Sequence, residues 1–136
     1  GSVIKGHPGI GAKVRGIALV ARDNFSARYD LDRIAGVFSR PAHALCGESY
    51  VDRILVLHTA KGGVASSWML YEMKSRNMAP AALLLNFSNP IMAQGAAFAD
   101  LPFVDRFEGD ITAFLQTGDE VEVDPASGAV TLLRRP

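Results

Sequence analysis

The residue types best able to do chemistry stand together in the stretch "HTAKGGVASS". The adjacent Gly62 and Gly63 allow positive φ angles and let another molecule approach the backbone. Lys61 adds a positive charge, and Ser66 and Ser67 add hydroxyls that both donate and accept hydrogen bonds. This combination suits the binding of a carboxylate or phosphate group. On pattern alone a tight turn followed by serines in the first helical turn is favoured, and both interpretations stay open.

The stretch matches no standard nucleotide-binding or nucleophile motif. Its lysine precedes the glycines, whereas the phosphate-binding loop G-x-x-x-x-G-K-[ST] places the lysine after them. No G-x-S-x-G occurs, so the strained turn that carries a catalytic serine in α/β-hydrolases is not expected. "GIGAKV" begins like G-x-G-x-x-G, but it precedes a strand and lacks the third glycine, so dinucleotide binding is not expected either.

Other candidate side chains are scattered along the chain. His58 lies at a predicted strand end beside the glycine pair and is a candidate substrate contact, but the three histidines lack the spacing of a zinc site. Asp30 and Asp32 in "RYDLDR" could act as a carboxylate pair, although surface acids in turns are commoner. Cys46 is expected to be a small buried apolar residue. The apolar residues expected in the core are Trp68, Met69 and Met73.

Buried strands and helices alternate around the glycine pair. Short continuous apolar runs predict strands buried on both faces, and helical spacing with capping signals predicts the helices between them. The expected strands are Lys13–Ala21, Arg53–Leu57, "PAALLLNF" and "LPFVD". The expected helices run from the glycine pair to about Asn77, from Asn89 and Pro90 through "IMAQGAAFA", and from an Asp110 cap through "ITAFLQ" to Gly118. "DEVEVD" and "AVTLLR", joined by "PASG", predict an antiparallel hairpin.

This order of elements predicts an α/β fold. Strand, helix, strand, helix, strand implies right-handed crossovers and a parallel central sheet, to which the hairpin and the first strand add an antiparallel layer. Between the first two strands, the segment 23–49 is long for a structureless connection and is a candidate binding loop. A mobile surface excursion is the alternative interpretation of this segment.

Length, charge and cysteine count limit the kinds of protein that this chain can be. At 136 residues and 49% hydrophobic content the chain fits one domain, expected over residues 3–136, with Gly1 and Ser2 as a cloning remnant. A net charge of zero without a basic stripe argues against nucleic acid as a partner. Apolar runs are far too short to cross a bilayer and no signal-peptide pattern is present, so a soluble cytoplasmic protein is expected. One cysteine cannot hold an iron–sulfur cluster alone, so any metal is expected mainly on a partner.

Five blocks carry a family resemblance: "ALCGES", "RILVLHTAKGGVASSWMLYEM", "APAALLLN", "NPIMAQGAAFADLPFVD" and "TGDEVEVD". In this order and spacing they resemble the small subunit, or swivel domain, of the aconitase X family. The resemblance implies a swivelling β/β/α domain like that of aconitase, within a hydro-lyase. Archaeal members dehydrate phosphomevalonate and bacterial members dehydrate cis-3-hydroxy-L-proline. It also implies no cofactor in this chain and an iron–sulfur cluster held by cysteines of a partner large subunit.

The resemblance also assigns site residues. Family members carry lysine, glycine, serine, two variable residues, glycine and serine, and Lys61, Gly62 and Ser67 keep their places. The serine held to transfer a proton in the family falls on Gly63, and the later glycine falls on Ser66. The family's glycine-glycine-valine-aspartate segment becomes "YDLD", which leaves Asp32 as its match.

Two functions follow from these departures. In the first, the chain is the swivel subunit of a dehydratase acting on a small hydroxylated carboxylate such as cis-3-hydroxy-L-proline. The Gly62 and Gly63 amides with Lys61 then orient the substrate carboxylate, and Ser67 or Ser66 serves proton transfer or hydrogen bonding. In the second, the chain is a paralogue that binds an anion or a partner without the usual chemistry.

Overall fold

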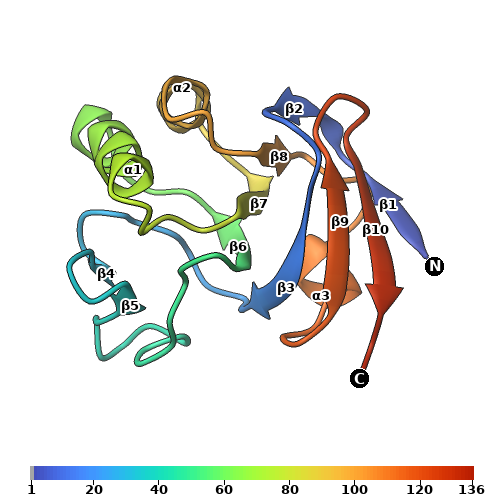
Figure 1. Ribbon diagram of the computed structural model, residues 1–136, viewed down its shortest axis with the longest axis horizontal. Coiled ribbons are helices and arrows are strands. Elements are labelled where there is room, and N and C mark those ends of the chain that lie inside the picture. The colour runs from blue at the N-terminus through green and yellow to red at the C-terminus, as the bar shows by residue number, and fades with distance from the viewer. Residues whose placement is uncertain (1) are drawn as a thin grey trace.

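A computed structural model describes residues 2–136 as three layers: an antiparallel β layer, a parallel β layer and a pair of helices (Figure 1). Eight of the strands form one mixed sheet in the order β1-β10-β9-β3-β6-β7-β8-β2. Its strands are β1 (Val3–Lys5), β2 (His7–Ile10), β3 (Val14–Val20), β6 (Ile54–Thr59), β7 (Ala82–Phe87), β8 (Phe103–Asp105), β9 (Glu120–Asp124) and β10 (Ala129–Arg134). The helices are α1 (Val64–Ser75), α2 (Pro90–Phe98) and α3 (Ile111–Phe114).

The parallel pairing of the predicted strands is confirmed. β3, β6, β7 and β8 pair in parallel, with Leu19 opposite Leu55 and Leu55 opposite Leu83. All the residues from Ile54 to Leu57 are fully buried, because α1 and α2 cover one face of these strands and the antiparallel layer and α3 cover the other. Asn89 caps α2 by accepting a hydrogen bond from the Met92 N–H at 2.8 Å, with Pro90 at the first helical position as expected.

β3 joins the two β layers. Its first half pairs antiparallel with β9, with Val14 opposite Val123, and its second half pairs parallel with β6. β9 and β10 form the expected hairpin. The shared strand therefore turns one continuous sheet into two stacked layers, and the predicted β/β/α architecture is confirmed.

Residues 3–10 form strands that the sequence analysis did not expect. β1 pairs with β10 and β2 pairs with β8, so these two short strands hold opposite edges of the sheet and are joined through Gly6. The Gly6 N–H donates to the Gly128 carbonyl at 2.8 Å, which ties this connection to the hairpin turn. The short segment "HPGI" contains proline and glycine, which are depleted in strands, so its sequence carries no strand signal. Gly1 of the expected cloning remnant lies outside the described residues.

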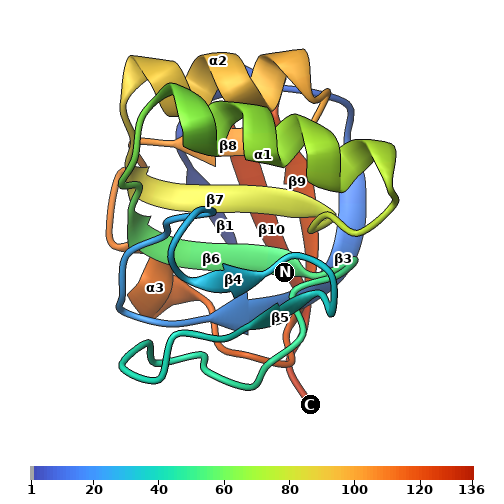
Figure 2. The same cartoon turned by 90° about the vertical axis from the view of Figure 1, so that its left-hand side faces the viewer.

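The segment 23–49 is packed rather than mobile. It carries a small antiparallel pair, β4 (Leu31–Asp32) and β5 (Val37–Phe38), and lies over β6 and β3 on the face that α1 also covers (Figure 2). Its buried residues Phe25, Leu31 and Phe38 belong to the same core cluster as Leu55 and Met73. This segment is therefore anchored on the core beside the glycine pair.

Three local expectations were wrong. Trp68 is 57% exposed, because α1 turns Ser66, Leu70 and Met73 to the core instead. Cys46 is exposed, since it lies in a turn of the 23–49 segment rather than on a core-facing strand. α3 ends at Phe114, well before Gly118, because Leu115 already adopts an extended conformation. No helix in residues 2–136 is both long and apolar enough to span a bilayer.

Candidate functional site

The glycine pair leaves the start of α1 open. Lys61, Gly62, Gly63, Val64 and Ala65 are all exposed, and α1 begins at Val64 without a side-chain cap. The Lys61 N–H donates to the Phe25 carbonyl at 2.7 Å, but among residues 2–136 no acceptor meets the N–H groups from Gly62 to Ala65. The first N–H groups of a helix carry a partial positive charge, so this junction can receive an anion.

The two glycines differ in what they permit. Gly62 has φ of 111°, and a Cβ on it would overlap the Ser66 side chain below. A Cβ on Gly63 would meet nothing within 4 Å. Only Gly62 is therefore required by the local geometry, while Gly63 leaves an open space at the mouth of the helix.

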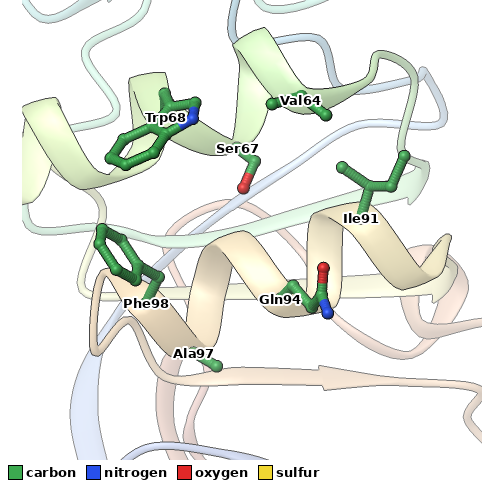
Figure 3. Close-up of a pocket in the computed structure, with 7 residues that line it drawn as sticks. All are labelled: Val64, Ser67, Trp68, Ile91, Gln94, Ala97 and Phe98. Carbon is green, nitrogen blue, oxygen red and sulfur yellow. The ribbon is translucent and has the colours of Figure 1, made fainter.

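The two serines point to different surroundings. Ser66 is 1% exposed and lies under Gly62. Ser67 lies in a groove between α1 and α2, and its hydroxyl points toward α2 (Figure 3). We call this the apolar groove; it measures about 590 Å³ and is lined by Val64, Ser67, Trp68, Ile91, Gln94, Ala97 and Phe98. Of the two hydroxyls, that of Ser67 is the one open to an incoming molecule.

Lys61 and Gly62 face a second hollow, formed with the 23–49 segment. We call it the loop pocket; it measures about 410 Å³ and is lined by Asp23, Asn24, Ser26, Tyr29, Asp30, Arg40, Lys61 and Gly62. The length of the 23–49 segment predicted a binding loop, but its sequence did not mark Arg40 as a site residue. A charged residue in a long loop gives no sign of its partner until the loop is folded.

Asp30 and Asp32 lie in different surroundings and do not form a carboxylate pair. Asp30 is 3% exposed, contrary to the expected surface acid, and its carboxylate accepts from the Ser26 N–H at 2.9 Å and from Arg40 Nε. Asp32 is exposed and accepts from the N–H groups of Ile34 and Ala35 at 3.0 Å. Asp32 therefore caps its own turn, and it does not line the loop pocket.

His43 and Asp23 hold the backbone of the segment that forms the loop pocket. The Leu45 N–H donates to His43 Nδ1 at 3.0 Å, which leaves Nε2 to donate to the Asn24 carbonyl at 2.8 Å. Burial raises the pKa of Asp23, but hydrogen bonds from the N–H groups of Ala44 and Asn24 outweigh it and lower the pKa overall. Asp23 therefore stabilises this loop as an ionised hydrogen-bond acceptor.

His58 lies on the opposite face of the parallel layer from the apolar groove. Its Nδ1 is 3.0 Å from Asn86 Nδ2, which also donates to Asp110 at 2.7 Å. Hydrogen bonds from Thr112 and Asn86 and the nearby charge of Arg22 lower the pKa of Asp110 to about 2. Successive side chains of a strand alternate between faces, so His58 follows Val56 rather than Leu57. His58 lines a separate hollow of about 300 Å³.

The candidate residues are thus divided among different surfaces. Lys61 and Gly62 share the loop pocket, Gly63 lies at the open helix start, and Ser67 faces the apolar groove. In the part of the chain that the structure describes, no group of three or more His, Cys, Asp or Glu side chains is placed to hold a metal ion.

Comparisons with known proteins agree with one another. The family described as the aconitase X swivel domain matches residues 3–132. The phosphomevalonate dehydratase small subunit of Methanococcoides burtonii is 39% identical over 125 residues, covering 89% of this chain and 91% of the relative. That of Methanocella arvoryzae is 33% identical over 129 residues, covering 95% and 98%.

A solved structure shows the same fold. The crystal structure of Thermococcus kodakaraensis aconitase X in its holo-form superposes with a TM-score of 0.91 and 32% sequence identity, covering 98% of this chain and 100% of the other. A match along almost the whole length, in sequence and in fold, leaves the family in no doubt. This chain belongs to the aconitase X swivel domain family.

Proposed function

We propose that this chain is the small subunit of a two-chain aconitase X-type hydro-lyase that removes water from a small hydroxylated carboxylate. Family membership and the dehydratase names of the relatives support the reaction class. The observation that carries the proposal is the run of uncovered N–H groups from Gly62 to Ala65, beside Lys61. A carboxylate is one of the anions that such a helix start binds.

The chain's own residues would hold the substrate and handle a proton. Elimination of water requires a base that removes the proton α to the carboxylate and a Lewis acid that polarises the departing hydroxyl. The Gly62 and Gly63 amides with Lys61 orient the carboxylate. Ser67, whose hydroxyl is accessible, or Ser66, which is buried under Gly62, supplies proton transfer or a hydrogen bond. A serine hydroxyl is a weak base unless a neighbour activates it, so in this role it depends on the partner chain.

The metal chemistry belongs to the partner in this proposal. The chain's one cysteine, Cys46, is exposed and stands alone, and a single thiolate does not fit an iron–sulfur cluster. A cluster held by the large subunit would supply the Lewis acid for the departing hydroxyl. A free exposed cysteine also suits a reducing compartment, so we place the enzyme in the cytoplasm.

An uncovered apolar surface beside the junction supports a two-chain assembly. Trp68 and Phe98 line the apolar groove with their rings 5.2 Å apart, and they are 57% and 59% exposed. Val64 belongs both to the open helix start and to this groove. A large subunit that reaches the free amides therefore also meets the groove, and large exposed apolar patches mark such interfaces. In this proposal the large subunit covers the apolar groove.

This assembly is tested by weakening the groove. Trp68→Ser with Phe98→Ser should weaken binding of the large subunit by roughly tenfold or more, because exposed aromatic residues dominate interface energetics. Ile34→Ser is the control, because Ile34 is 78% exposed on the 23–49 segment, away from the groove. The measurement is the dissociation constant from sedimentation velocity. If both variants bind the large subunit with the affinity of the wild type, this docking site is contradicted. It is also contradicted if the groove substitutions abolish a homodimer of this chain and leave the two-chain complex intact.

The reaction is tested by reconstitution with the large subunit encoded in the same genome. Dehydration of phosphomevalonate and of cis-3-hydroxy-L-proline is measured side by side, since the relatives are named for the first substrate and our sequence analysis favours the second. Turnover of either one by the complex and by neither chain alone is the expected result. Ser66→Ala with Ser67→Ala should reduce kcat by roughly a hundredfold if a serine transfers the proton. Unchanged turnover removes the serines from that role.

A second function is favoured by one residue. Gly63 stands where the family carries a serine, and a Cβ there meets nothing within 4 Å, so the expected hydroxyl is missing while the space for it remains. In this alternative the chain is a non-catalytic module that binds an anion or a partner. It predicts a stable complex without turnover, and Gly63→Ser should then introduce dehydration activity. A wild-type complex that already turns over contradicts it.

A further inference from the structure

The loop pocket contains two cationic side chains from distant parts of the chain. Arg40 comes from the 23–49 segment and Lys61 from the junction before α1. The two segments are fixed to each other, because the Lys61 N–H donates to the Phe25 carbonyl at 2.7 Å and Phe25 forms a β-bridge with Ala60. The two cations therefore line one hollow on a packed framework, beside the Gly62 amide.

A buried carboxylate fixes the direction of Arg40. The side chain of Asp30 is 4% exposed, and its Oδ1 accepts from Arg40 Nε at 2.5 Å while Oδ2 accepts from the Ser26 N–H at 2.9 Å. The Asp30 carbonyl also accepts from the Ser39 N–H at 2.8 Å, which holds the backbone beside Arg40. A guanidinium has five N–H donors in a rigid fork, and pairing through Nε leaves the outer amines available.

The loop pocket contains as many acidic as basic side chains, but its two carboxylates are already hydrogen-bonded within the loop. Asp23 and Asp30 balance the charges of Arg40 and Lys61, but both acids accept hydrogen bonds from the loop itself, from Asn24, Ala44 and Ser26 among others. In residues 2–136 neither the Arg40 outer amines nor the Lys61 ammonium has a hydrogen-bond acceptor. The negative groups are thus satisfied within the loop, and the positive groups are the ones left for a ligand.

We propose that Arg40 is a second anion-binding residue of this site. Its outer amines, with Lys61 and the Gly62 N–H, bind one oxyanion group of the ligand, either a carboxylate or a phosphate. Asp30 is a positioning residue that holds the guanidinium and does not touch the ligand. This inference rests on the proposed function for the identity of the substrate, but binding of an oxyanion by the chain itself does not depend on the partner.

The direct test is an NMR titration of the chain with inorganic phosphate and, separately, with acetate. The backbone amides of Gly62 and Gly63 and the Nε–H signal of Arg40 should shift in a saturable way. Arg40→Gln should weaken the binding by roughly tenfold, since charged hydrogen bonds are lost, and Arg40→Lys should restore part of it. Tighter binding of phosphate or of acetate identifies the oxyanion that the pocket prefers. Arg15→Gln is the control, because Arg15 is an exposed arginine paired with Glu122.

Folding is monitored in the same spectra. Arg40 lies partly at the surface, with 39% of its side chain exposed, so Arg40→Gln should keep the dispersion of the wild-type spectrum. Asp30→Asn should shift the Arg40 Nε–H signal in the free protein and weaken binding less than Arg40→Gln does. Absence of saturable shifts in the wild type, or equal affinity of wild type and Arg40→Gln, overturns the proposal.

The reconstituted enzyme separates this inference from the proposed function. Arg40→Gln should raise KM by roughly tenfold and change kcat much less, because a contact that holds the anion equally in the ground state and the transition state contributes to binding alone. Turnover with an unchanged KM overturns the role of Arg40 while the dehydratase assignment stands. Binding that depends on Arg40 in a complex without any turnover contradicts the dehydratase assignment and leaves the anion site in place.

Discussion

At the scale of single residues, the adjacent glycines have different roles. Gly62 has φ of 111° and the Ser66 side chain occupies the space that its Cβ would need, whereas Gly63 has a negative φ and open space at that position. The sequence predicted a backbone that another molecule can approach, and the exposed junction has that form. Which serine faces outward could not be predicted, because the two differ by one helical step of 100° and the packing of α2 decides between them.

Alanine at the two glycines tests this distinction. Gly62→Ala should destabilise the fold by about 1–3 kcal/mol, because the residue would be strained at positive φ and its Cβ would overlap Ser66. Gly63→Ala is the matched comparison and should cost less, about 0.5–1 kcal/mol, because its Cβ enters open space and only the poorer N-capping by alanine destabilises α1. Urea denaturation followed by circular dichroism measures both. Equal losses for the two variants would contradict the local geometry described here.

The contacts of Arg40 and Asp32 could not be predicted from the sequence. Arg40 and Asp30 are ten positions apart in a segment without periodicity, and nothing in their types identifies them as a pair. The family match directs attention to Asp32, but in the structure this residue caps a turn. Loop side chains find their partners only when buried anchors such as Phe25 and Phe38 fix the loop on the core.

At the scale of elements, α1 and α2 approach closely at one point. A Cβ on Gly95 of α2 would lie 2.5 Å from Ser67 Oγ and 2.9 Å from Ser67 Cα. This contact sets the floor of the apolar groove and the position of the Ser67 hydroxyl. The starts of α2 and α3 were predictable from the capping residues Asn89 and Asp110, and α1 from helical spacing after the glycine pair, but the exposed face of α1 was not predictable. Apolar residues lie on both sides of this helix, so periodicity alone did not select the buried one.

Gly95→Ala tests the contact between the helices. It should destabilise the protein by about 1–3 kcal/mol through overpacking, although alanine favours an isolated helix over glycine. It should also widen the groove and lower turnover in the reconstituted enzyme, since Ser67 would move. Thermal unfolding measures the stability, and Ala113→Ser, at an exposed position of α3 outside the groove, is the control. A stabilised Gly95→Ala variant would show that the helices can separate without cost.

The cap of α3 predicts a pH dependence. Asp110 accepts from the Thr112 N–H at 2.9 Å, and its pKa of about 2 lies below the 3.8 of an unperturbed aspartate. Its ionised form therefore stabilises the folded state above about pH 4, and this contribution is lost as pH falls towards 2. Asp110→Asn keeps a capping oxygen without a titrating group. Urea unfolding from pH 5 to pH 2 should show a smaller loss for the variant, and equal losses would contradict this role.

At the scale of the whole molecule, residues 3–10 hold the two ends of the sheet. β1 pairs with β10 and β2 with β8, so an otherwise open eight-stranded sheet has its opposite edges joined by one short stretch of chain. The parallel strands and the hairpin were predictable because their patterns are local. This closure was not, because it depends on the distant hairpin turn at Gly128 and on close backbone approach at Gly9.

Gly9→Ala tests the closure. A Cβ at this position would overlap the carbonyl oxygen of Phe103 in β8, so β2 would have to leave the sheet edge. The expected loss of stability is about 2–4 kcal/mol, as for other severe steric changes in packed regions, and the freed edge should promote association. Gly109→Ala is the control, because its Cβ would lie 4.0 Å from the nearest atom. Unfolding and light scattering measure the two effects, and a Gly9→Ala protein of wild-type stability and size would contradict the closure.

The whole arrangement places Lys61 between the open helix start and the loop pocket, so it is the side chain on which the proposed binding of a substrate anion most depends. The most direct measurement is therefore steady-state dehydration by the reconstituted two-chain enzyme with Lys61→Gln, beside Lys5→Gln on the exposed strand β1 as control. We predict a KM raised by roughly tenfold with a much smaller change in kcat, and no effect of Lys5→Gln. A KM equal to that of the wild type would contradict the account of this junction as the substrate-anion site.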